Sequence, residues 1–517
     1  MWDRIDRRNL ANKIWHACDI MRRDDGTTGI LEYTEQLSWL IFLKVLEDVE
    51  KRFEDEALFA GREYHPIIEP QYRWSAWATK EDKELMKYFT EEELNLIKQR
   101  GEHILTAFID YKLFPYLKSL RGNPERDRIA AIFQEIRGNR MKSPYNLRDV
   151  ILLLNDIDFN NVEDSHVLSQ VYEELLLRLG REGGVAGEFY TPRPIVRLMV
   201  KIIQPEIGET VFDPFCGSCG FLIESYKRMK ESKELTVEDY ERLQKATFYG
   251  QEKKSLPYLI GVMNCILHGL STPNIVRKNT LEEDIRNIPE QRRFDVILTN
   301  PPFGGKESRQ IQQNFPVKSQ ATELLALQYV MKKLRKGGRC GIVVPEGILF
   351  RGDAFKIVKR ELLQNYNLHT IISLPAGVFA NVTSSGQGPK TNLLFFERTG
   401  GTKEIWYYDF AGYSEKVLKK KYTKANPVSD EDFEDCYEKW KKREISEYSW
   451  IVPVDEVIQR DYDLTARNPN IREEYEYESP EVILSEIMEK EKKIQEILDR
   501  LYEDLNKTKE KEDVWKF

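Results

Sequence analysis

The first third of the chain carries apolar residues at helical spacing. Thr90 and Glu93 fit a capping box, in which each side chain accepts a hydrogen bond from the backbone amide of the other residue. Leu94 and Ile97 then continue at helical spacing. Residues 37–46 are apolar on nearly every side, which indicates a segment in a domain core. The pattern predicts a helical N-terminal domain over 1–170, with a proline-containing loop at 64–77.

After residue 180 the pattern changes to short β-rich runs that alternate with helical segments. Glycines at 183, 184 and 187 mark a loop or hinge before this region. The runs predicted as strands are 210–215, 247–250, 294–299, 338–344, 369–374, 391–397 and 404–409, and 324–335 is predicted as a helix. Such alternation is typical of an α/β fold, with a mainly parallel sheet and helices on both faces. The last strands lack helices between them, so an antiparallel edge is expected.

Charged residues become frequent again from about residue 411 to residue 478. Lysines cluster at 416, 419, 420, 421 and 424, and a second group of cations lies at 439, 441, 442 and 443. Beyond them, apolar residues recur at intervals of three, four or seven: Ile483, Ile487, Ile494, Ile497, Leu501 and Leu505. This spacing predicts a helix over 479–517 that docks on a partner helix. The sheet domain is expected to cover 171–410, and the charged extension 411–478 to complete it.

The composition indicates a protein of several domains. At about 100–200 residues per domain, 517 residues suggest two to four. No apolar run approaches the ~20 residues of a membrane span, and the charged start lacks the apolar core of a secretion signal. Six cysteines are too few for a disulfide scaffold, so we expect a cytoplasmic protein without a membrane contact. The net charge of −8 means that any DNA contact needs a local basic surface or a basic partner.

The most specific motif is Asn300-Pro301-Pro302-Phe303, which directly follows an apolar strand. Ligands of open α/β sheets bind at the carboxyl ends of strands, where these residues fall. Two prolines remove two amide donors, so the loop presents acceptors, namely the Asn300 side-chain oxygen and the Pro301 carbonyl. Two acceptors in this geometry suit a planar amino group, and Phe303 offers a face on which a base can stack. The simpler interpretation is a strand-end turn stiffened by proline.

A second motif is the glycine-containing loop of residues 211–222, which connects a strand to a helix. Such a loop lets a ligand approach the backbone closely at the first crossover of a sheet. It is neither a dinucleotide fingerprint nor a P-loop, and Asp213 suits a ligand that carries an amino group. Cys216 and Cys219 have the spacing of a metal pair, but no second Cys/His pair follows at ligand spacing. We therefore expect no metal.

Two further segments add weaker signals. Glu252 ends the next strand, where an acidic residue is well placed to bind ribose hydroxyls, although a surface glutamate is an equally good interpretation. Residues 187–194 contain two prolines and an aromatic pair before a helix predicted over 195–203. This segment forms an ordered loop that, taken alone, simply begins the helix.

Together these motifs resemble the amino-group DNA methyltransferases. The order of Gly-Glu-Phe-Tyr-Thr-Pro at 187–192, Asp-Pro-Phe-Cys-Gly at 213–217 and Asn-Pro-Pro-Phe at 300–303 matches the class whose cofactor loop precedes its catalytic loop. More narrowly, the chain is similar to the modification subunit of type I restriction-modification systems. The runs at 336–345 and 460–469, the helical N-terminal region and the C-terminal helix also fit.

The resemblance implies S-adenosyl-L-methionine as methyl donor and adenine N6 in DNA as acceptor, on the sheet typical of S-adenosylmethionine-dependent methyltransferases. It implies that the methionine side of the cofactor is lined by Glu188, Phe189, Tyr190, Thr191, Pro192, Arg193, Gly217, Ser218, Cys219 and Gly220. Asp213 would support the loop and Glu252 would hold the ribose. Asn279 falls where the family's adenine-contacting loop usually has Asp. Phe379 resembles the aromatic residue that packs against the extruded base, although it fits a core position equally well.

The implied mechanism needs no nucleophilic cysteine. Acceptors from Asn300 and Pro301 would draw on the N6 hydrogens, so that the nitrogen lone pair points at the methyl group for in-line displacement. The base must leave the duplex at a cost of roughly a few kcal/mol. Stacking on Phe303 would recover part of that cost, about 1–3 kcal/mol.

Three alternatives remain open at this point. Asn-Pro-Pro-aromatic loops also occur in methyltransferases that act on RNA bases or on a glutamine amide. A stand-alone DNA methyltransferase is possible, but no segment after residue 410 has the ~150 residues of a self-contained recognition domain. Because a base reader is missing, the resemblance favours a separate specificity subunit, bound through the C-terminal helix, together with a second copy of this chain and a restriction subunit. The third alternative is a non-catalytic subunit that only binds the cofactor.

Overall fold

The computed structural model describes residues 2–59, 61, 63–157, 191–270, 273–379, 389–423, 426–465, 468–470 and 480–513. The chain divides into two compact units, Met1–Asn468 and Pro469–Phe517. The predicted hinge at 181–187 and the site candidates Glu188, Phe189 and Tyr190 lie outside the described residues.

The N-terminal part of the first unit is helical, as the sequence predicts. Its α-helices are α1 (Trp2–Arg22), α2 (Ile30–Phe59), α3 (Trp74–Trp77), α4 (Asp82–Leu85), α5 (Glu91–Gln99), α6 (Ile104–Phe108), α7 (Phe114–Ser119), α8 (Pro124–Glu135) and α9 (Pro144–Asn155). The capping box at the start of α5 is confirmed, since Thr90 Oγ1 accepts from the Glu93 amide and Glu93 from the Thr90 amide. The apolar run 37–46 lies in α2, and its apolar side chains are buried.

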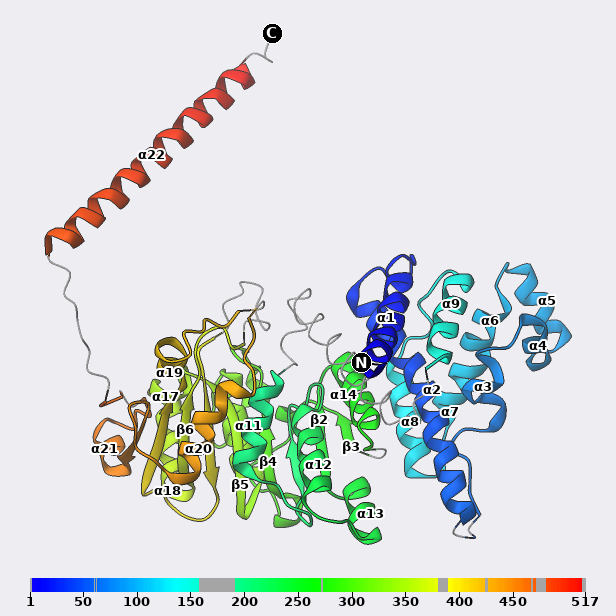
Figure 1. Ribbon diagram of the computed structural model, residues 1–517, viewed down its shortest axis with the longest axis horizontal. Coiled ribbons are helices and arrows are strands. Elements are labelled where there is room, and N and C mark those ends of the chain that lie inside the picture. The colour runs from blue at the N-terminus through cyan, green and yellow to red at the C-terminus, as the bar shows by residue number, and fades with distance from the viewer. Residues whose placement is uncertain are drawn as a thin grey trace. The chain divides into compact units, whose positions relative to one another are not determined.

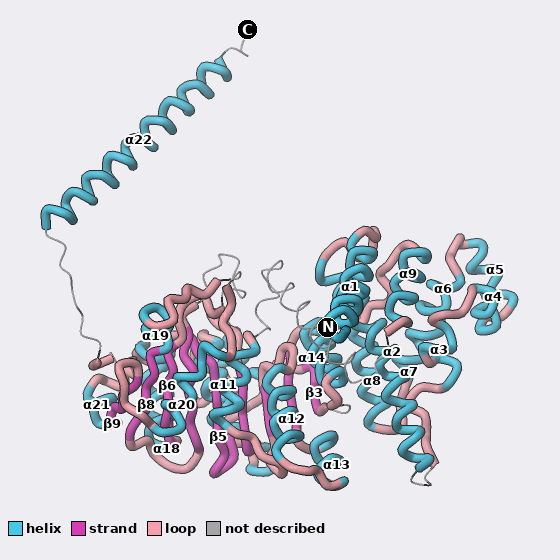
Figure 2. The backbone as a smooth tube through the Cα atoms, viewed as in Figure 1, coloured by secondary structure: helices cyan, strands magenta, loops and turns pink. Residues whose placement is uncertain are grey.

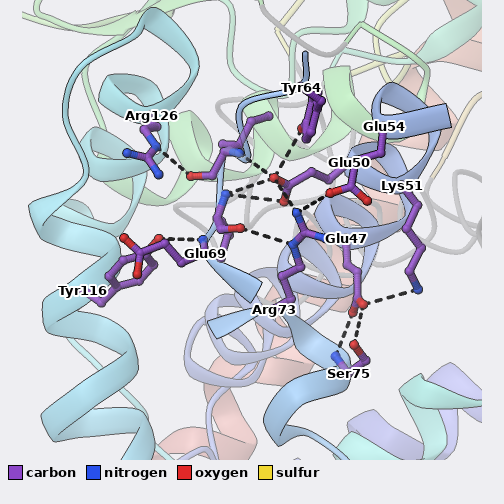
Figure 3. A network of polar contacts seen from close by, with 12 residues as sticks. Glu47, Glu50, Lys51, Glu54, Tyr64, Glu69, Arg73, Ser75, Tyr116 and Arg126 are labelled. Carbon is purple, nitrogen blue, oxygen red and sulfur yellow. Dashed lines mark hydrogen bonds and ion pairs between the residues drawn. The ribbon is translucent and has the colours of Figure 1, made fainter. Parts of the chain in front are cut away.

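The segment 64–77 is not only a loop, because it contains the short helices η1 (Pro70–Tyr72) and α3. Carboxylates of α2 contact this segment (Figure 3). Glu50 is fully buried and accepts hydrogen bonds from the backbone amides of residues 67 and 68. Glu47 accepts from the amide and the hydroxyl of Ser75, at 2.8 and 2.6 Å. The prolines suggested a loop, whereas these long-range carboxylates stabilise two helical turns.

The rest of the first unit is built on one nine-stranded sheet in the order β3-β2-β1-β4-β5-β7-β6-β8-β9 (Figures 1 and 2). The strands are β1 (Val211–Asp213), β2 (Phe248–Glu252), β3 (Asn274–Arg277), β4 (Phe294–Thr299), β5 (Leu334–Pro345), β6 (Asn367–Ser373), β7 (Thr391–Glu397), β8 (Glu404–Asp409) and β9 (Ser449–Pro453). Along the sheet from β3 through β2, β1 and β4 to β5, each strand is parallel to its neighbour. Strand β7 is antiparallel to β5 and β6, and β9 is antiparallel to β8. The α/β fold with antiparallel strands at one side is thereby confirmed.

The sheet differs from the sequence prediction in three details. Strands β3 and β9 carry too short a pattern to be recognised in the sequence, and β3 includes the exposed Val276. Strand β5 begins at Leu334, so the helix expected over 324–335 ends earlier. Strands β6 and β8 pair in parallel, although the sequence shows no helix between them that would connect two parallel strands. The strand that separates them in the chain, β7, lies on the other side of β6, between β5 and β6.

Helices cover both faces of the sheet. They are α11 (Arg193–Ile203), α12 (Gly220–Ser232), α13 (Val237–Lys245), α14 (Ser255–Leu267), α15 (Arg309–Gln312), α16 (Thr322–Lys333), α17 (Gly347–Phe350), α18 (Ala354–Asn365), α19 (Phe410–Lys416), α20 (Glu434–Lys442) and α21 (Val454–Gln459). Side chains of β4 alternate between two hydrophobic clusters. Val296 and Leu298 pack with α11, α12 and α14, whereas Ile297 packs with α16 and α18. The central strands are therefore buried on both sides.

Polar contacts join the N-terminal helices to the β3 side of the sheet. Arg128 of α8 donates to Asn274 Oδ1 at 2.8 Å. Glu135 of α8 accepts from Ser255 and Arg277. These contacts hold α8 against β3 and the first residue of α14.

The second unit contains one long helix, α22 (Pro480–Asp513). Its apolar side chains at 484, 487, 488, 494, 497, 498 and 501 are all more than half exposed. In the described part of the chain, no helix combines the length and the apolar character that crossing a membrane requires.

Candidate functional site

The predicted site residues converge at one edge of the sheet. Strand β1 lies between β2 and β4 and is parallel to both. Asp213, Glu252 and Asn300 occupy or directly follow the carboxyl ends of these three neighbouring strands. Residues at such ends meet at a common edge, which is the usual ligand site of open α/β sheets.

The glycine-containing loop after β1 is tightly packed. Gly217 and Cys219 have φ of 45° and 60°, a left-handed conformation in which Cys219 begins α12. A Cβ on Gly261 of α14 would lie 2.5 Å from the Gly217 carbonyl oxygen, and a Cβ on Gly220 would lie 2.0 Å from Arg193 Nη1. Glycines at 220 and 261 therefore allow α11 and α14 to approach this loop closely.

Glu252 fixes the same loop from β2. Its Oε2 accepts from the Gly217 amide at 3.1 Å and its Oε1 from the Lys254 amide at 2.8 Å. Burial raises the pKa of the Glu252 carboxyl above its ordinary value, although the backbone hydrogen bonds act in the opposite direction. Each carboxylate oxygen can accept more than one hydrogen bond, so both retain capacity for ligand hydroxyls.

Asp213 links the ends of β1 and β4. It is buried, and its Oδ1 accepts from Thr299 Oγ1 at 2.6 Å and from the Phe215 amide at 3.1 Å. Burial raises its pKa to about 7, against the effect of these hydrogen bonds. Asp213 therefore supports the backbone between the loop and Asn300.

Asn300 presents an acceptor with no donor. Its Nδ2 donates to Thr191 Oγ1 at 3.0 Å. Its Oδ1 is buried and accepts no hydrogen bond from the residues that the structure describes. A buried acceptor without a donor is unfavourable unless a ligand satisfies it. Asn300 is therefore the residue that most directly indicates a binding function.

The aromatic residues form the next layer. Phe303 is half-buried, and its ring meets that of Phe379 at a centroid distance of 6.2 Å and an interplanar angle of 90°. Phe379 is only 1% exposed, so it supports Phe303 edge-on from within the core. Phe303 is the ring that reaches the cavity.

Two cavities meet at Asn300. The larger has a volume of about 240 Å³ and is lined by Pro214, Phe215, Gln251, Glu252, Lys253, Lys254, Asn279, Thr280, Leu281, Asn300, Pro302, Phe303, Gly305, Glu307 and Thr322. The smaller is lined by Thr191, Val196, Asp213, Phe215, Cys216, Ser218, Gly220, Phe221 and Asn300. Asn300 lines both cavities, and the smaller one has a volume of only about 20 Å³, so a ligand that reaches Asn300 has its room in the larger cavity.

Comparison with known proteins identifies the family. A family model described as N-6 DNA Methylase matches residues 163–478, and a second, described as HsdM N-terminal domain, matches residues 10–154. This chain belongs to the N-6 DNA methylase family. The match covers both cavities and all the site residues predicted from the sequence.

Full-length relatives of this N-6 DNA methylase agree with that assignment. The EcoEI type I restriction enzyme methylase subunit of Escherichia coli is 36% identical over 507 residues, which cover 95% of this chain and 97% of the relative. A modification subunit of a putative type I restriction enzyme from Vibrio vulnificus is 39% identical with a TM-score of 0.79, covering 91% of this chain and 99% of that one. A chain from a structure of type I R-M complex assembly is 50% identical with a TM-score of 0.75, covering 97% and 99%.

In this N-6 DNA methylase, Asn279 is occupied by local hydrogen bonds. Its Oδ1 accepts from the Leu281 amide at 3.3 Å, and its Nδ2 donates to Glu282 Oε1 at 3.1 Å. It thus begins the short helix η5 (Thr280–Glu282), whose residues line the larger cavity. Asn279 and the first two residues of η5, Thr280 and Leu281, together form this wall.

Sequence reasoning missed several residues of this N-6 DNA methylase site. Thr280 Oγ1 contacts both the Pro214 carbonyl and Gln251 Oε1, and so connects η5 to the loop and to β2. Glu307 and Thr322 close the cavity and are hydrogen bonded to each other at 3.1 Å. Gln251 and Thr280 are each adjacent to a residue that the sequence singles out, Glu252 and Asn279. Glu307 and Thr322 come from segments whose spacing carries no functional signal.

The paired cysteines pack within the site and contribute no exposed thiol. Cys216 and Cys219 are buried, and the pKa of the Cys216 thiol is raised by its hydrogen bond with Cys219 and by burial. A Cβ on Gly250 would lie 3.0 Å from Cys216 Sγ, so β2 packs directly on this thiol. The chemistry of the site therefore lies with Asn300 and its neighbours.

Proposed function

We propose that this chain transfers a methyl group from S-adenosyl-L-methionine to N6 of adenine in DNA, as the modification subunit of a type I restriction-modification complex. The observation that carries the proposal is the buried, unsatisfied Asn300 Oδ1 at the junction of two cavities. Family membership and the full-length type I relatives support it.

The residues of the edge fit the proposed cofactor. Thr191, Ser218 and Gly220 line the smaller cavity and would contact the methionine part of the cofactor, together with Pro192, Arg193, Gly217 and Cys219. Glu252 lines the larger cavity and keeps acceptor capacity for ribose hydroxyls. The cofactor supplies an electrophilic methyl group on a sulfonium. Glu188, Phe189 and Tyr190 are assigned to the same part by the resemblance alone.

The chain's own groups would prepare the adenine. Asn300 Oδ1 and the Pro301 carbonyl would accept the two N6 hydrogens and fix the direction of the nitrogen lone pair. Thr191 holds the Asn300 nitrogen, so the amide oxygen is the end that stays available. Phe303 would stack on the base, which recovers about 1–3 kcal/mol of the flipping cost, while Phe379 braces Phe303 from behind.

The proposed partners follow from the relatives. Because related chains are type I methylase subunits, we propose association with a specificity subunit, a second copy of this chain and a restriction subunit. The exposed apolar residues of α22 are proposed to bind the specificity subunit. We further propose that the complex works in the cytoplasm.

The test is transfer of labelled methyl groups from S-adenosylmethionine to mixed DNA, by the chain alone and with the subunit encoded beside it. Activity that requires the neighbouring subunit would support the proposal, whereas activity of the chain alone would favour a self-sufficient methyltransferase. Absence of transfer with all subunits present would favour the non-catalytic alternative.

Replacing the unsatisfied acceptor tests the mechanism. We expect Asn300→Ala to lower methyl transfer by at least about 100-fold, because preorganised polar groups contribute on that order. Phe303→Ala should lower it by about 10- to 100-fold through lost stacking, and both variants should leave cofactor affinity largely unchanged. The matched control is Asn365→Ala, since Asn365 is an exposed residue at the end of α18. Undiminished transfer in either site variant would remove Asn300 and Phe303 from the mechanism.

A further inference from the structure

The lysine-rich segment after α19 lies at the same edge of the sheet as Asn300. Strand β8 is parallel to β6, and β6 runs in the same direction as β4 because both β5 and β6 are antiparallel to β7. Helix α19 begins directly after Asp409, the last residue of β8. Lys416, the last residue of α19, and the lysines that directly follow it therefore belong to the segment that leaves the sheet at the carboxyl edge, where Figure 1 labels α19.

Tyr422 anchors this segment beside the aromatic pair of the site. Its side chain is buried and its ring stacks on Phe410 at 6.1 Å. A Cβ on Gly377 would lie only 2.3 Å from the Tyr422 carbonyl oxygen, and the φ of +93° at Gly377 also favours glycine. Gly377 precedes Phe379 by two residues, and Phe379 contacts Phe303. The lysine-rich segment thus contacts the backbone at Gly377, two residues before the side chain that supports Phe303.

Three cations of this segment are available to a ligand. Lys416, Lys419, Lys420 and Lys421 are all exposed. Lys420 pairs with Asp432, but Lys416, Lys419 and Lys421 form no ion pair within the described part of the chain. The neighbouring acid is Glu415, which is also exposed. We call Lys416, Lys419 and Lys421 the edge lysines.

The second lysine group differs in both place and pairing. Helix α20 starts next to Phe433, which stacks on Phe410, and is followed by Arg443, which donates to the His369 carbonyl of β6. The negative charges of Glu404 and Glu397 also act on the Arg443 guanidinium. Glu404 lies at the amino end of β8, and Glu397 lies at the carboxyl end of β7, which is antiparallel to the neighbouring strands. The helix therefore runs from the catalytic edge toward the opposite edge. Its Lys439 and Lys441 pair with Asp435 and Glu438.

We propose that the edge lysines bind the phosphates of the DNA strand that carries the adenine, and that the lysines of α20 do not. The proposal rests on the proposed function. A nucleotide whose base stacks on Phe303 and faces Asn300 carries its flanking phosphates along the carboxyl edge. A chain with a net charge of −8 needs local cations there, and unpaired lysines can neutralise phosphates without first breaking an ion pair.

The test compares two variants with the same change in charge. The first replaces the edge lysines (Lys416→Gln, Lys419→Gln and Lys421→Gln), and the control replaces three lysines of α20 (Lys439→Gln, Lys441→Gln and Lys442→Gln). Each full-length variant is assembled with its specificity subunit, and its affinity for a fluorescent mixed-sequence duplex is measured over a range of salt. Cofactor binding and thermal unfolding are measured in parallel, as a check on folding.

Affinity falls as salt rises, and we expect this fall to be less steep in the edge variant. The magnitude of the slope of log affinity against log salt should decrease by about 0.9 for each phosphate that is no longer neutralised, or about 2–3 in total, with cofactor affinity unchanged. The α20 variant should keep the wild-type slope. An edge variant with an unchanged slope, or an equal decrease in both variants, would overturn the proposal. If the triple variant folds poorly, Lys421→Gln alone should still lower the slope by about one.

The same samples separate this inference from the proposed function. If the wild-type complex methylates DNA and the edge variant retains the wild-type salt dependence, only the phosphate assignment fails. If the wild-type complex transfers no methyl group to DNA, the proposed function fails first.

Discussion

At the scale of single residues, the site depends on side chains whose hydrogen-bonding groups are partly held in place by neighbours. Thr191 Oγ1 accepts from the nitrogen of Asn300, and the Asn300 oxygen is buried without a donor among the residues that the structure describes. Thr299 and the Phe215 amide both donate to the same oxygen of Asp213. Burial nevertheless dominates at Asp213 and raises its pKa to about 7. The result is a carboxyl that titrates near neutral pH beneath the proposed cofactor loop.

This carboxyl predicts a pH-dependent stability difference. Between pH 4 and 7 the folded state keeps the proton on Asp213 while the unfolded state loses it, so the free energy of unfolding falls as pH rises. Asp213→Asn keeps a neutral group that can still accept from Thr299. We expect its stability relative to wild type to improve with pH across this window, by on the order of 2–4 kcal/mol, and to level off above pH 7.

The measurement is the difference in unfolding midpoint between variant and wild type at several pH values. Asp149→Asn, at an exposed position of α9, is the control and should show no such trend. If the difference in unfolding midpoint between Asp213→Asn and wild type is the same at pH 5 and pH 8, the raised pKa of Asp213 is contradicted.

At the scale of elements, a buried ion pair anchors the wall formed by η5. Glu283 follows η5 and accepts from Lys333 at 2.8 Å and from Tyr329 at 2.7 Å, both on α16. Burial would raise the pKa of Glu283, but hydrogen bonds from Lys333 and Tyr329 outweigh it and lower the pKa. Lys333 itself is almost fully buried. Helix α16 thereby fixes the segment whose residues 279–281 line the larger cavity.

Removing the cation of this pair should be costly. We expect Lys333→Met to destabilise the fold by ~3 kcal/mol, because Glu283 loses one of its buried partners, and to weaken cofactor binding through η5. Lys332→Met is the control, since Lys332 pairs with Glu361 at a partly exposed position and should cost less than about 1 kcal/mol. Urea denaturation and cofactor titration of both variants provide the comparison. Equal effects at 332 and 333 would show that the buried pair has no special role.

At the scale of the whole molecule, α22 forms a unit of its own with an exposed apolar row. Ile487, Ile494 and Leu501 are spaced by seven residues and are all more than half exposed. An exposed row of this kind is typical of a helix that packs against another helix. The described residues that line the two cavities, by contrast, all belong to Met1–Asn468.

We therefore expect deletion of residues 480–517 to weaken assembly with the specificity subunit and to leave S-adenosylmethionine binding intact. Ile487→Glu combined with Ile494→Glu should have a similar effect, because charge is placed on the apolar row. Lys493→Glu, on a residue paired with Glu489, is the control. Co-purification and analytical sedimentation measure assembly. Undiminished assembly of the deletion variant would exclude α22 as the docking element.

Much of this molecule can be predicted from the sequence, because several signals are local. The capping box at Thr90, the central strands β4 and β5, the α/β class and the Asn300 motif are each encoded within a few neighbouring residues. Hydrogen bonds and side-chain periodicity over such distances depend little on the rest of the chain. The order of the motifs also sufficed to suggest the family that the comparisons confirm.

Only the tertiary structure decided what depends on residues far apart in the chain. Strand order brings Asp213, Glu252 and Asn300 to one edge, and long-range packing buries Asn300 Oδ1 where no described residue donates to it. Insertion of β7 between β5 and β6 sets the direction of β8, and hence the edge at which Lys416 lies. Two similar lysine groups in the sequence therefore end in different places. The reason is physical: composition fixes how many charges the chain has, but strand pairing and packing fix which of them remain exposed and unpaired beside the site.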